Sequence, residues 1–389
     1  MGSDRLRIAL VAPPWYPLPP RGYGGTELVV HLLHTELTRM GHEVVVFGAE
    51  GSGPGVTAVA DSGWTKDLGG AFEYPRLDTY LARVYNRLAG QRFDVIHDHS
   101  SLVGVLLALH AKAAPVVVHT IHGELLESFC TFYQEVAGKV RLCAISKSQA
   151  ASAPAVQVAA VVPNAVEIPG SPPGHTRERY LLEVARITHD KGQHLAIDVA
   201  RRTGRKLILA GKVERSGEGE RYFEEEIEPH LGRSVEYDPN VQGAEKSRRV
   251  SRAAAGFFPL QWPEPVVRAK VECMVGCPPV LALGPGAAPE LIEDGVTGFL
   301  ADDVEGLVAA AGRLDRIDPL RCAEVARERF SPRVMAEPYL DVSLRGTASQ
   351  TLTPASPEHV CLAGPGPLRP LAPHRRSRPP TKGPPTPRM

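Results

Sequence analysis

Residues 262–274, WPEPVVRAKVECM, combine two carboxylates with the signal for a helix start. Pro265 suits the first position of a helix, where its missing N–H costs nothing, so we expect a helix that begins at Glu264. Unpaired N–H groups at such a start stabilise an anion. In this chain those groups belong to Val266, Val267 and Arg268.

Glu272 follows Glu264 by eight residues, about 12 Å along a helix with a rise of ~1.5 Å per residue. This span could place one carboxylate on a sugar and the other on a ribose, with a diphosphate between them. Glu272 also stands among Val271, Cys273 and Met274, where an unpaired acid is costly. A salt bridge in the core is therefore the alternative interpretation.

Arg186 and Lys191, in VARITHDKG, directly follow an expected strand. Two cations that flank a turn can clamp a diphosphate, because Arg offers a two-pronged fork of donors and Lys a point charge. The alternatives are solvated surface charge and, for either cation, an ion pair with Asp190.

The loop after the first expected strand, residues 13–25, ends in Gly24-Gly25 and leads into a helix. Glycines let the backbone approach a ligand closely, and a helix start favours anions. The spacing is not G-x-G-x-x-G, so it gives little support to dinucleotide binding. A flexible turn is the alternative.

Histidines end two further strands, in His97-Asp98-His99 and in HTIHG, residues 119–123. His122, which precedes a glycine, is the better candidate for contact with a polar ligand. No spacing of Cys, His and Asp completes a metal site, so we expect none.

Six cysteines are scattered along the chain, and the C-x3-C at Cys273 and Cys277 lacks a second ligand pair. Reduced thiols and a cytoplasmic location are the expectation. Lys+Arg and Asp+Glu number 44 each, so the charge gives no argument for nucleic acid or an anionic membrane as partner. The apolar runs at 8–12 and 102–118 are too short or too interrupted for a signal core or a transmembrane segment.

Short apolar runs alternate with amphipathic stretches along most of the 389 residues. Continuous apolar strands separated by helices indicate parallel sheets covered on both faces. The expected strands lie at residues 7–12, 43–47, 93–97, 115–121, 141–146, 180–185, 206–210, 234–237, 256–259 and 279–283. The expected helices lie at residues 26–40, 192–201, 222–230, 319–330 and 334–344.

A stretch rich in Pro and Gly interrupts this rhythm after residue 162. We therefore predict an α/β chain with two doubly wound Rossmann-type domains, residues 1–165 and 179–345, joined by a linker at 166–178. Residues 346–389 are dense in Pro and Arg and are expected to be a disordered tail.

In their order, these motifs resemble the retaining GT-B glycosyltransferases of family four, glycosyl transferases group 1, over residues 7–344. The resemblance depends on the GGTE loop, FDVIHDH, the strand ending in His122, AISKSQ, PNAVE, Arg186 with Lys191, Glu264 with Glu272, and PELIEDGVTGFL from residue 289. It implies a GT-B-like fold, with the two domains facing a central cleft.

The resemblance also implies transfer of a sugar from a nucleoside-diphosphate donor to an acceptor hydroxyl, with retention of configuration. The partners would be the nucleotide-sugar donor and a small-molecule or glycan acceptor. As the residues that match the family's motifs, Glu264 and His122 would be catalytic and would contact the transferred sugar. The donor would be bound by Gly24, Gly25, Arg186, Lys191, Val267, Arg268 and Glu272.

Such a site would need no metal or other cofactor, because fixed cations and helix N–H groups stabilise the leaving diphosphate. The sequence departs from the family's pattern at Val267, Cys277 and Pro239, where glycines are common. Two alternatives therefore stay open: a catalytically silent GT-B binding subunit and a sugar-nucleotide epimerase. Contacts to the acceptor are expected in loops at residues 16–23 and 62–80.

Overall fold

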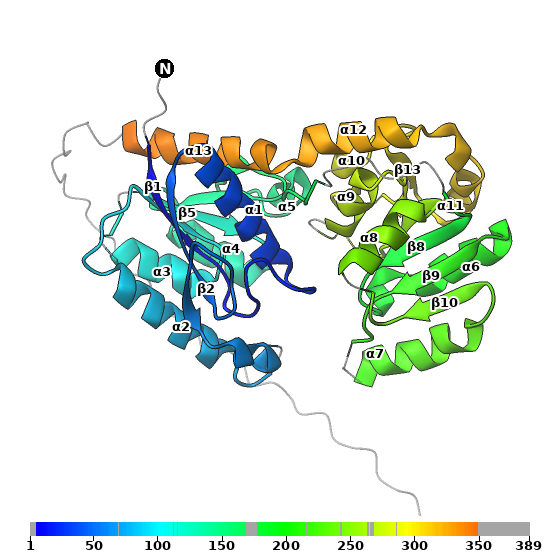
Figure 1. The fold of residues 1–389 in the computed structure, drawn as a ribbon, viewed down its shortest axis with the longest axis horizontal. Coiled ribbons are helices and arrows are strands. Elements are labelled where there is room, and N and C mark those ends of the chain that lie inside the picture. Colours follow the sequence, from blue (N-terminus) through cyan, green and yellow to red (C-terminus); the bar gives the residue numbers. More distant parts are fainter. Residues whose placement is uncertain are drawn as a thin grey trace, which may run out of the picture. The chain divides into compact units, whose positions relative to one another are not determined.

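The structure is a computed structural model of the chain (Figure 1). It describes residues 5–68, 70–111, 113–114, 116–168, 177–214, 217–241, 243–262, Glu264, 268–284 and 286–348. All of these residues belong to one compact unit. Within it, the strands form two parallel sheets, each covered by helices.

The first sheet has the strand order β3-β2-β1-β4-β5-β6-β7 over the described residues, and every pairing is parallel. Its strands are β1 (Arg7–Val11), β2 (Glu43–Ala49), β3 (Val56–Ala60), β4 (Val95–Asp98), β5 (Val116–Ile121), β6 (Arg141–Ala144) and β7 (Ala160–Val161). The helices of this half are α1 (Gly25–Arg39), η1 (Ser62–Asp67), α2 (Glu73–Leu88), α3 (Leu102–His110), α4 (Glu127–Glu135) and α5 (Lys147–Ser152).

Apolar side chains on both faces of β1 explain why this strand is buried at the centre of the sheet. Ile8 and Leu10 lie in one core with α1, and Ala9 and Val11 lie in another with α2 and α3. Successive strand residues point to opposite faces, so a continuous apolar run serves both layers.

The second sheet has the order β10-β9-β8-β11-β12-β13 over the described residues and is also parallel. Its strands are β8 (Tyr180–Val184), β9 (Lys206–Ala210), β10 (Val235–Asp238), β11 (Ala255–Phe258), β12 (Val280–Leu283) and β13 (Gly298–Ala301). The remaining elements are η2 (His189–Lys191), α6 (Gln193–Thr203), α7 (Gly217–Tyr222), η3 (Phe223–Ile227), η4 (Glu228–His230), α8 (Gly243–Arg252), α9 (Arg268–Val275), α10 (Ala288–Leu291), α11 (Val304–Ala311), η5 (Leu314–Arg316), α12 (Pro319–Phe330) and α13 (Pro332–Ala348). The predicted fold class, two doubly wound α/β sheets, is confirmed.

The last helix, α13, departs from the predicted grouping of elements. It follows α12 directly and was expected in the second domain, residues 179–345. Its Met335, Ala336 and Tyr339 lie instead in the core of the first half, with β1 and α1 (Figure 1). The periodicity of a helix gives its apolar face but not the sheet that the face covers.

Two further segments differ from the sequence-based expectation. The helix expected at 222–230 is three short pieces, with π-helical geometry in η3 and Pro229 in the final 3₁₀ turn. The regular α-helix already ends at Tyr222, and Pro229, which has no N–H to continue the ladder, lies seven residues later. The loop expected at 62–80 contains η1 and the first half of α2. The expected tail lies almost entirely outside the described residues, which end at Ala348.

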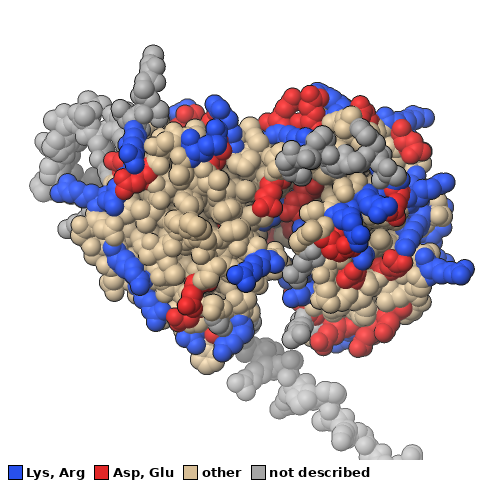
Figure 2. All heavy atoms as spheres, in the orientation of Figure 1, with Lys and Arg blue, Asp and Glu red and all other residues tan. Residues whose placement is uncertain are grey.

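On the face shown in Figure 2, acidic and basic side chains are interspersed over the half that holds the second sheet. This pattern agrees with equal numbers of acidic and basic residues. None of the described helices has the length and apolarity needed to span a membrane.

Candidate active site

Lys191 and Glu264 form the central ion pair of the candidate site. Lys191 Nζ lies 2.7 Å from Glu264 Oε2 and 5.3 Å from the centre of the Trp262 ring, and the Lys191 side chain is 9% exposed. A buried ammonium requires such partners. The structure therefore brings together two of the predicted residues that stand 73 positions apart.

The turn after β8 fixes Lys191 in this position. Gly192 has a φ of +79°, and a Cβ there would collide with the carbonyl oxygen of Pro259, so the turn requires glycine. Gln261 N–H donates to Asp190 O at 3.0 Å, and its side-chain amide donates to His189 O at 2.8 Å. These bonds tie the Lys191 turn to the loop that carries Glu264.

Arg186 follows β8 on the same turn, but its guanidinium is directed to another partner. Nη1 donates to Glu214 Oε1 at 2.9 Å, and the side chain is 50% exposed. Gln193 donates to the Arg186 carbonyl at 3.0 Å, which holds the backbone in place. Arg186 is thus on the predicted loop as an accessible cation, whereas its predicted contact with a ligand stays a prediction.

Arg268 joins the first glycine loop to α9. Its Nη1 donates to Gly25 O at 2.8 Å and its Nη2 to Glu272 Oε1 at 2.7 Å. A Cβ on Gly25 would lie 3.4 Å from Nη1, an ordinary van der Waals contact, so this bond does not by itself require glycine. Gly24, with a φ of +136°, supplies the bend before α1.

Glu272 is held by two cations, as the core salt-bridge alternative predicted. Besides Arg268, Lys246 Nζ lies 2.6 Å from Glu272 Oε2. Burial opposes ionisation, but Lys246 and Arg268 together bring the pKa of Glu272 below its usual value. An ionised carboxylate has about four acceptor positions, so two cations leave room for ribose hydroxyls.

His122, the predicted contact of the transferred sugar, follows β5. Its Nε2 lies 2.9 Å from Nδ1 of His99, and burial lowers the pKa of His122 to about 3. The side-chain amide of Gln149 donates to the carbonyls of Ile121 and Gly123 at 2.9 and 2.6 Å. The backbone on both sides of His122 is thereby fixed, and the ring is neutral.

Buried polar atoms without a hydrogen-bonding partner among the described residues gather next to these groups. Sequence reasoning did not select most of the side chains that carry them. They are Thr188 Oγ1, Gln193 Oε1, Glu183 Oε2, Trp262 Nε1 and Arg268 Nε. Such atoms are costly when unpaired, so their gathering fits a site for a polar ligand.

Two buried charged residues next to the site were also missed. Glu27, in the GGTE loop, is 3% exposed, and burial raises its pKa to about 7. Lys270, in α9, is 1% exposed, and burial lowers its pKa to about 8. The GGTE motif itself was the available signal for Glu27; nothing in the apolar periodicity of α9 singles out Lys270.

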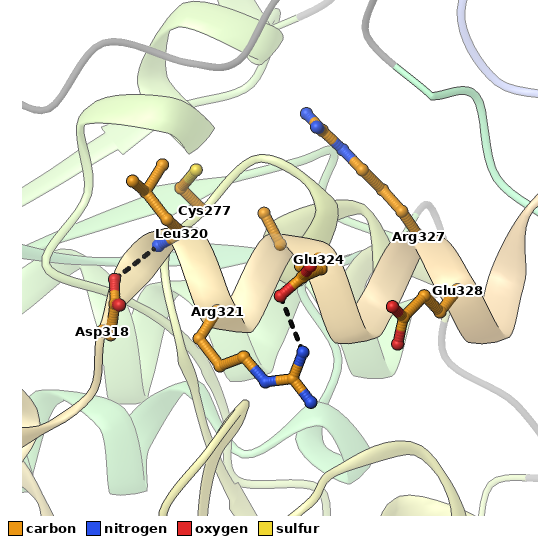
Figure 3. A pocket seen from close by; sticks show the side chains of 8 residues that line it. Cys277, Asp318, Leu320, Arg321, Glu324, Arg327 and Glu328 are labelled. Carbon is orange, nitrogen blue, oxygen red and sulfur yellow. Dashed lines mark hydrogen bonds and ion pairs between the residues drawn. The ribbon is translucent and has the colours of Figure 1, made fainter.

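Val267 lies outside the described residues, and α9 is described from Arg268 onward. In the part of the chain that is described, no group of three or more His, Cys, Asp or Glu side chains is arranged to hold a metal ion. A surface pocket of about 520 Å³ lies elsewhere, along α12 and beside Cys277 (Figure 3). None of the predicted site residues lines it.

Comparison with known proteins places this arrangement in a family. Glycosyltransferase Family 4 matches residues 23–167, and Glycosyl transferases group 1 matches residues 167–317. A curated Escherichia coli protein, UDP-Gal:alpha-D-GlcNAc-diphosphoundecaprenol alpha-1,3-galactosyltransferase, is 42% identical over 50 residues. That match spans 12% of this chain and only 13% of the relative.

Solved structures share the fold over most of the chain. AviGT4, a glycosyltransferase involved in avilamycin A biosynthesis, has a TM-score of 0.68 and 23% identity, covering 88% of this chain and 98% of AviGT4. Anabaena Alr3699/HepE in complex with UDP-glucose has a TM-score of 0.62 and 17% identity, covering 89% of this chain and 100% of that protein. With both sheets matched in sequence and in fold, the chain belongs to the GT-B glycosyltransferases of group 1.

Proposed function

We propose that the protein transfers a sugar from a nucleoside-diphosphate donor to an acceptor hydroxyl, with retention of configuration at the anomeric carbon. The observation that carries the proposal is the Lys191–Glu264 pair at 2.7 Å, at the carboxyl end of a parallel sheet. Ligands of open α/β sheets bind at this end of the strands. A carboxylate beside an ammonium suits a ligand with hydroxyl and phosphate groups next to each other.

In the proposed reaction, the bond between the anomeric carbon and the diphosphate breaks, and its electron pair leaves with the diphosphate. The acceptor oxygen bonds to the same face of the sugar, and its proton passes to a departing phosphate oxygen. Lys191, Arg186 and the open end of α9 would stabilise the negative charge that develops. No metal is required by this scheme, because protein cations neutralise the leaving group.

Glu264 would accept hydrogen bonds from hydroxyls of the transferred sugar, and Glu272 from those of the ribose. Lys191 would orient the Glu264 carboxylate while it contacts the phosphate. The unpaired Thr188 and Trp262 atoms beside this pair supply further donors or acceptors for the ligand.

A uridine diphosphate sugar is the first donor to test, because the HepE structure contains UDP-glucose and the E. coli relative is named for UDP-Gal. The proposal also puts the protein in the cytoplasm. Its described cysteines Cys130, Cys143, Cys273, Cys277 and Cys322 are free, as in a reducing compartment.

The test is a panel of sugar nucleotides screened by thermal shift, followed by mass spectrometry of the products with candidate acceptors. Glu264→Gln should abolish transfer, whereas the matched control Glu305→Gln, at an exposed ion pair, should leave the rate unchanged. Transfer at the full rate by Glu264→Gln would remove this residue from the mechanism. Binding without transfer would favour a silent binding subunit, and release of a free epimerised sugar would favour an epimerase.

A further inference from the structure

His99 and His122 are joined by a direct hydrogen bond between their rings. His99 Nδ1 lies 2.9 Å from His122 Nε2, and the ring centres are 5.2 Å apart. The backbone N–H of His99 donates to Val11 O at 2.9 Å, which anchors the residue at the end of β4. His99 is 3% exposed, whereas His122 is partly exposed.

Both rings are neutral, so each carries a single proton. Burial lowers the pKa of His99 well below its usual value and that of His122 to about 3, and the neighbouring histidines add to the effect. A neutral imidazole donates from one nitrogen and accepts at the other. The bond between the rings therefore requires one ring to donate and the other to accept.

The far nitrogen of His99 decides which ring donates. Nε2 of His99 is buried and has no hydrogen-bonding partner in the described part of the chain. If His122 donated, His99 would accept at Nδ1 and would hold its own proton at Nε2, as a buried and unpaired N–H. Among backbone groups, orphaned buried N–H groups are rarer than under-satisfied carbonyls, and we carry the same preference over to the ring nitrogens. The favoured arrangement therefore has His99 donating from Nδ1–H.

Together with His99 and His122, two further histidines, His97 and His119, make up a cluster. Each of these two has its own hydrogen-bonding partners and so does not compete for the proton shared between His99 and His122. His119 Nδ1 lies 2.7 Å from Asp98 Oδ2, and its Nε2 lies 3.1 Å from the Tyr133 hydroxyl. Asp98 also accepts from the backbone and hydroxyl of Ser100.

His97 is held in the same way, on the other side of His99. His97 Nε2 lies 2.8 Å from Thr120 Oγ1, which donates to the Tyr339 hydroxyl at 3.0 Å. His97 and His119 are thus each held by hydrogen bonds of their own, outside the His99–His122 bond.

We infer that His99 is a positioning residue that keeps the proton of His122 on Nδ1, so that His122 donates a hydrogen bond to a ligand oxygen and does not act as a base. The Nε2 lone pair of His122 is occupied by His99, which leaves Nδ1–H for the ligand. Only the identity of this ligand oxygen depends on the proposed function, which assigns it to the donor sugar or its phosphate.

The tautomer can be measured without any substrate, by ¹⁵N NMR of the imidazole nitrogens in the full chain. The inference predicts a protonated, pyrrole-type signal for His122 Nδ1 and a pyridine-type signal for Nε2. His99→Asn places an amide donor near the position of Nδ1 and should keep this pattern. His99→Leu removes the donor and should give His122 as a mixture of tautomers.

Transfer assays add a second readout. His99→Leu should lower the transfer rate about tenfold, His99→Asn should recover it to within about threefold, and the exposed control His110→Leu should leave it unchanged. A proton on Nε2 of His122 in the unsubstituted protein would overturn the inference, whatever the activity. If the Nδ1–H form is found but no sugar nucleotide binds, the tautomer assignment stands and the proposed function fails.

Discussion

Arg268 donates a hydrogen bond to the carbonyl oxygen of Gly25, 243 positions earlier in the chain, at 2.8 Å. This one guanidinium ties the loop after β1 to the start of α9, since its other nitrogen bonds Glu272. A second tie runs between the same halves, where the backbone N–H groups of Lys147 and Ser148 donate to Glu290. Side chains of the candidate site therefore depend on contacts between segments from both sheets.

Arg268→Gln should weaken binding of a nucleoside diphosphate about tenfold, or ~1.4 kcal/mol, because the variant removes a cation and frees both Gly25 and Glu272. Titration calorimetry with UDP measures the change. Arg202→Gln, at an exposed pair with Glu305, is the control and should bind UDP like the unsubstituted protein. Equal affinities in the two variants would exclude Arg268 from donor binding.

Lys191 and Glu264 should affect different parts of the donor. Lys191→Met should raise the Kd for UDP by about tenfold or more, because the ammonium is assigned to the diphosphate. Glu264→Gln should leave the Kd for UDP within about threefold and raise the Kd for the sugar nucleotide, since this carboxylate is assigned to the sugar. Calorimetry with both ligands separates the roles. Identical losses for the two ligands in both variants would mean that the pair acts as a single structural unit.

Much of the fold was predictable because apolar runs reveal strands regardless of what they pack against. β9 and α12 have the predicted bounds, Lys206–Ala210 and Pro319–Phe330. α2 was missed because Phe72, before its first residue, provides no side-chain cap, although Glu73 and Pro75 in the first turn are compatible with a helix start. The packing of α13 was missed because a helical pattern does not identify the partner sheet.

The candidate site, like the fold, was predictable only in part. Position at the end of a strand selected Lys191, Arg186 and His122, and the expected helix start selected Glu264. Partners brought by other elements were not readable: Lys246 reaches Glu272 from α8, and Glu214 reaches Arg186 from the loop after β9. Sequence spacing reports neighbours along one element, whereas these ion pairs depend on how elements pack.

Cys277 should be replaceable by glycine with a gain in stability. It is a non-glycine residue with a φ of +85°, and the resemblance to the family leads us to expect glycine at this position. The left-handed conformation costs a residue with a Cβ roughly 1–2 kcal/mol, which exceeds the entropy cost of glycine. We expect Cys277→Gly to raise the free energy of unfolding by about 1 kcal/mol in urea titrations.

The control for this substitution is Cys273→Gly. Cys273 is equally buried but stands inside α9, where glycine is unfavourable, so this variant should lose stability. If both glycine variants are destabilised, the backbone at Cys277 is not strained in solution.

Glu27 should make stability fall as pH rises towards neutrality. Burial raises the pKa of Glu27 to about 7 from 4.5, with a partly opposing effect of Arg268. Between these two values the folded state holds a proton that the unfolded state releases, so the folded state binds more protons. The contribution of the protonated Glu27 to the free energy of unfolding is therefore fully present below pH 4.5. It is lost as pH rises through about 7, by an amount on the order of 3 kcal/mol.

Glu27→Gln keeps the size of the side chain and removes its titration, so the variant should be more stable than the unsubstituted protein at pH 8 and similar to it at pH 5. Urea unfolding at both pH values gives the difference, and Glu305→Gln, at an exposed carboxylate, should show no such crossover. Other groups shape the pH profile of both proteins alike, so the difference between them isolates Glu27. Parallel profiles for Glu27→Gln and the unsubstituted protein would show that this carboxyl ionises normally in the folded state, with its charge solvated or paired next to Arg268.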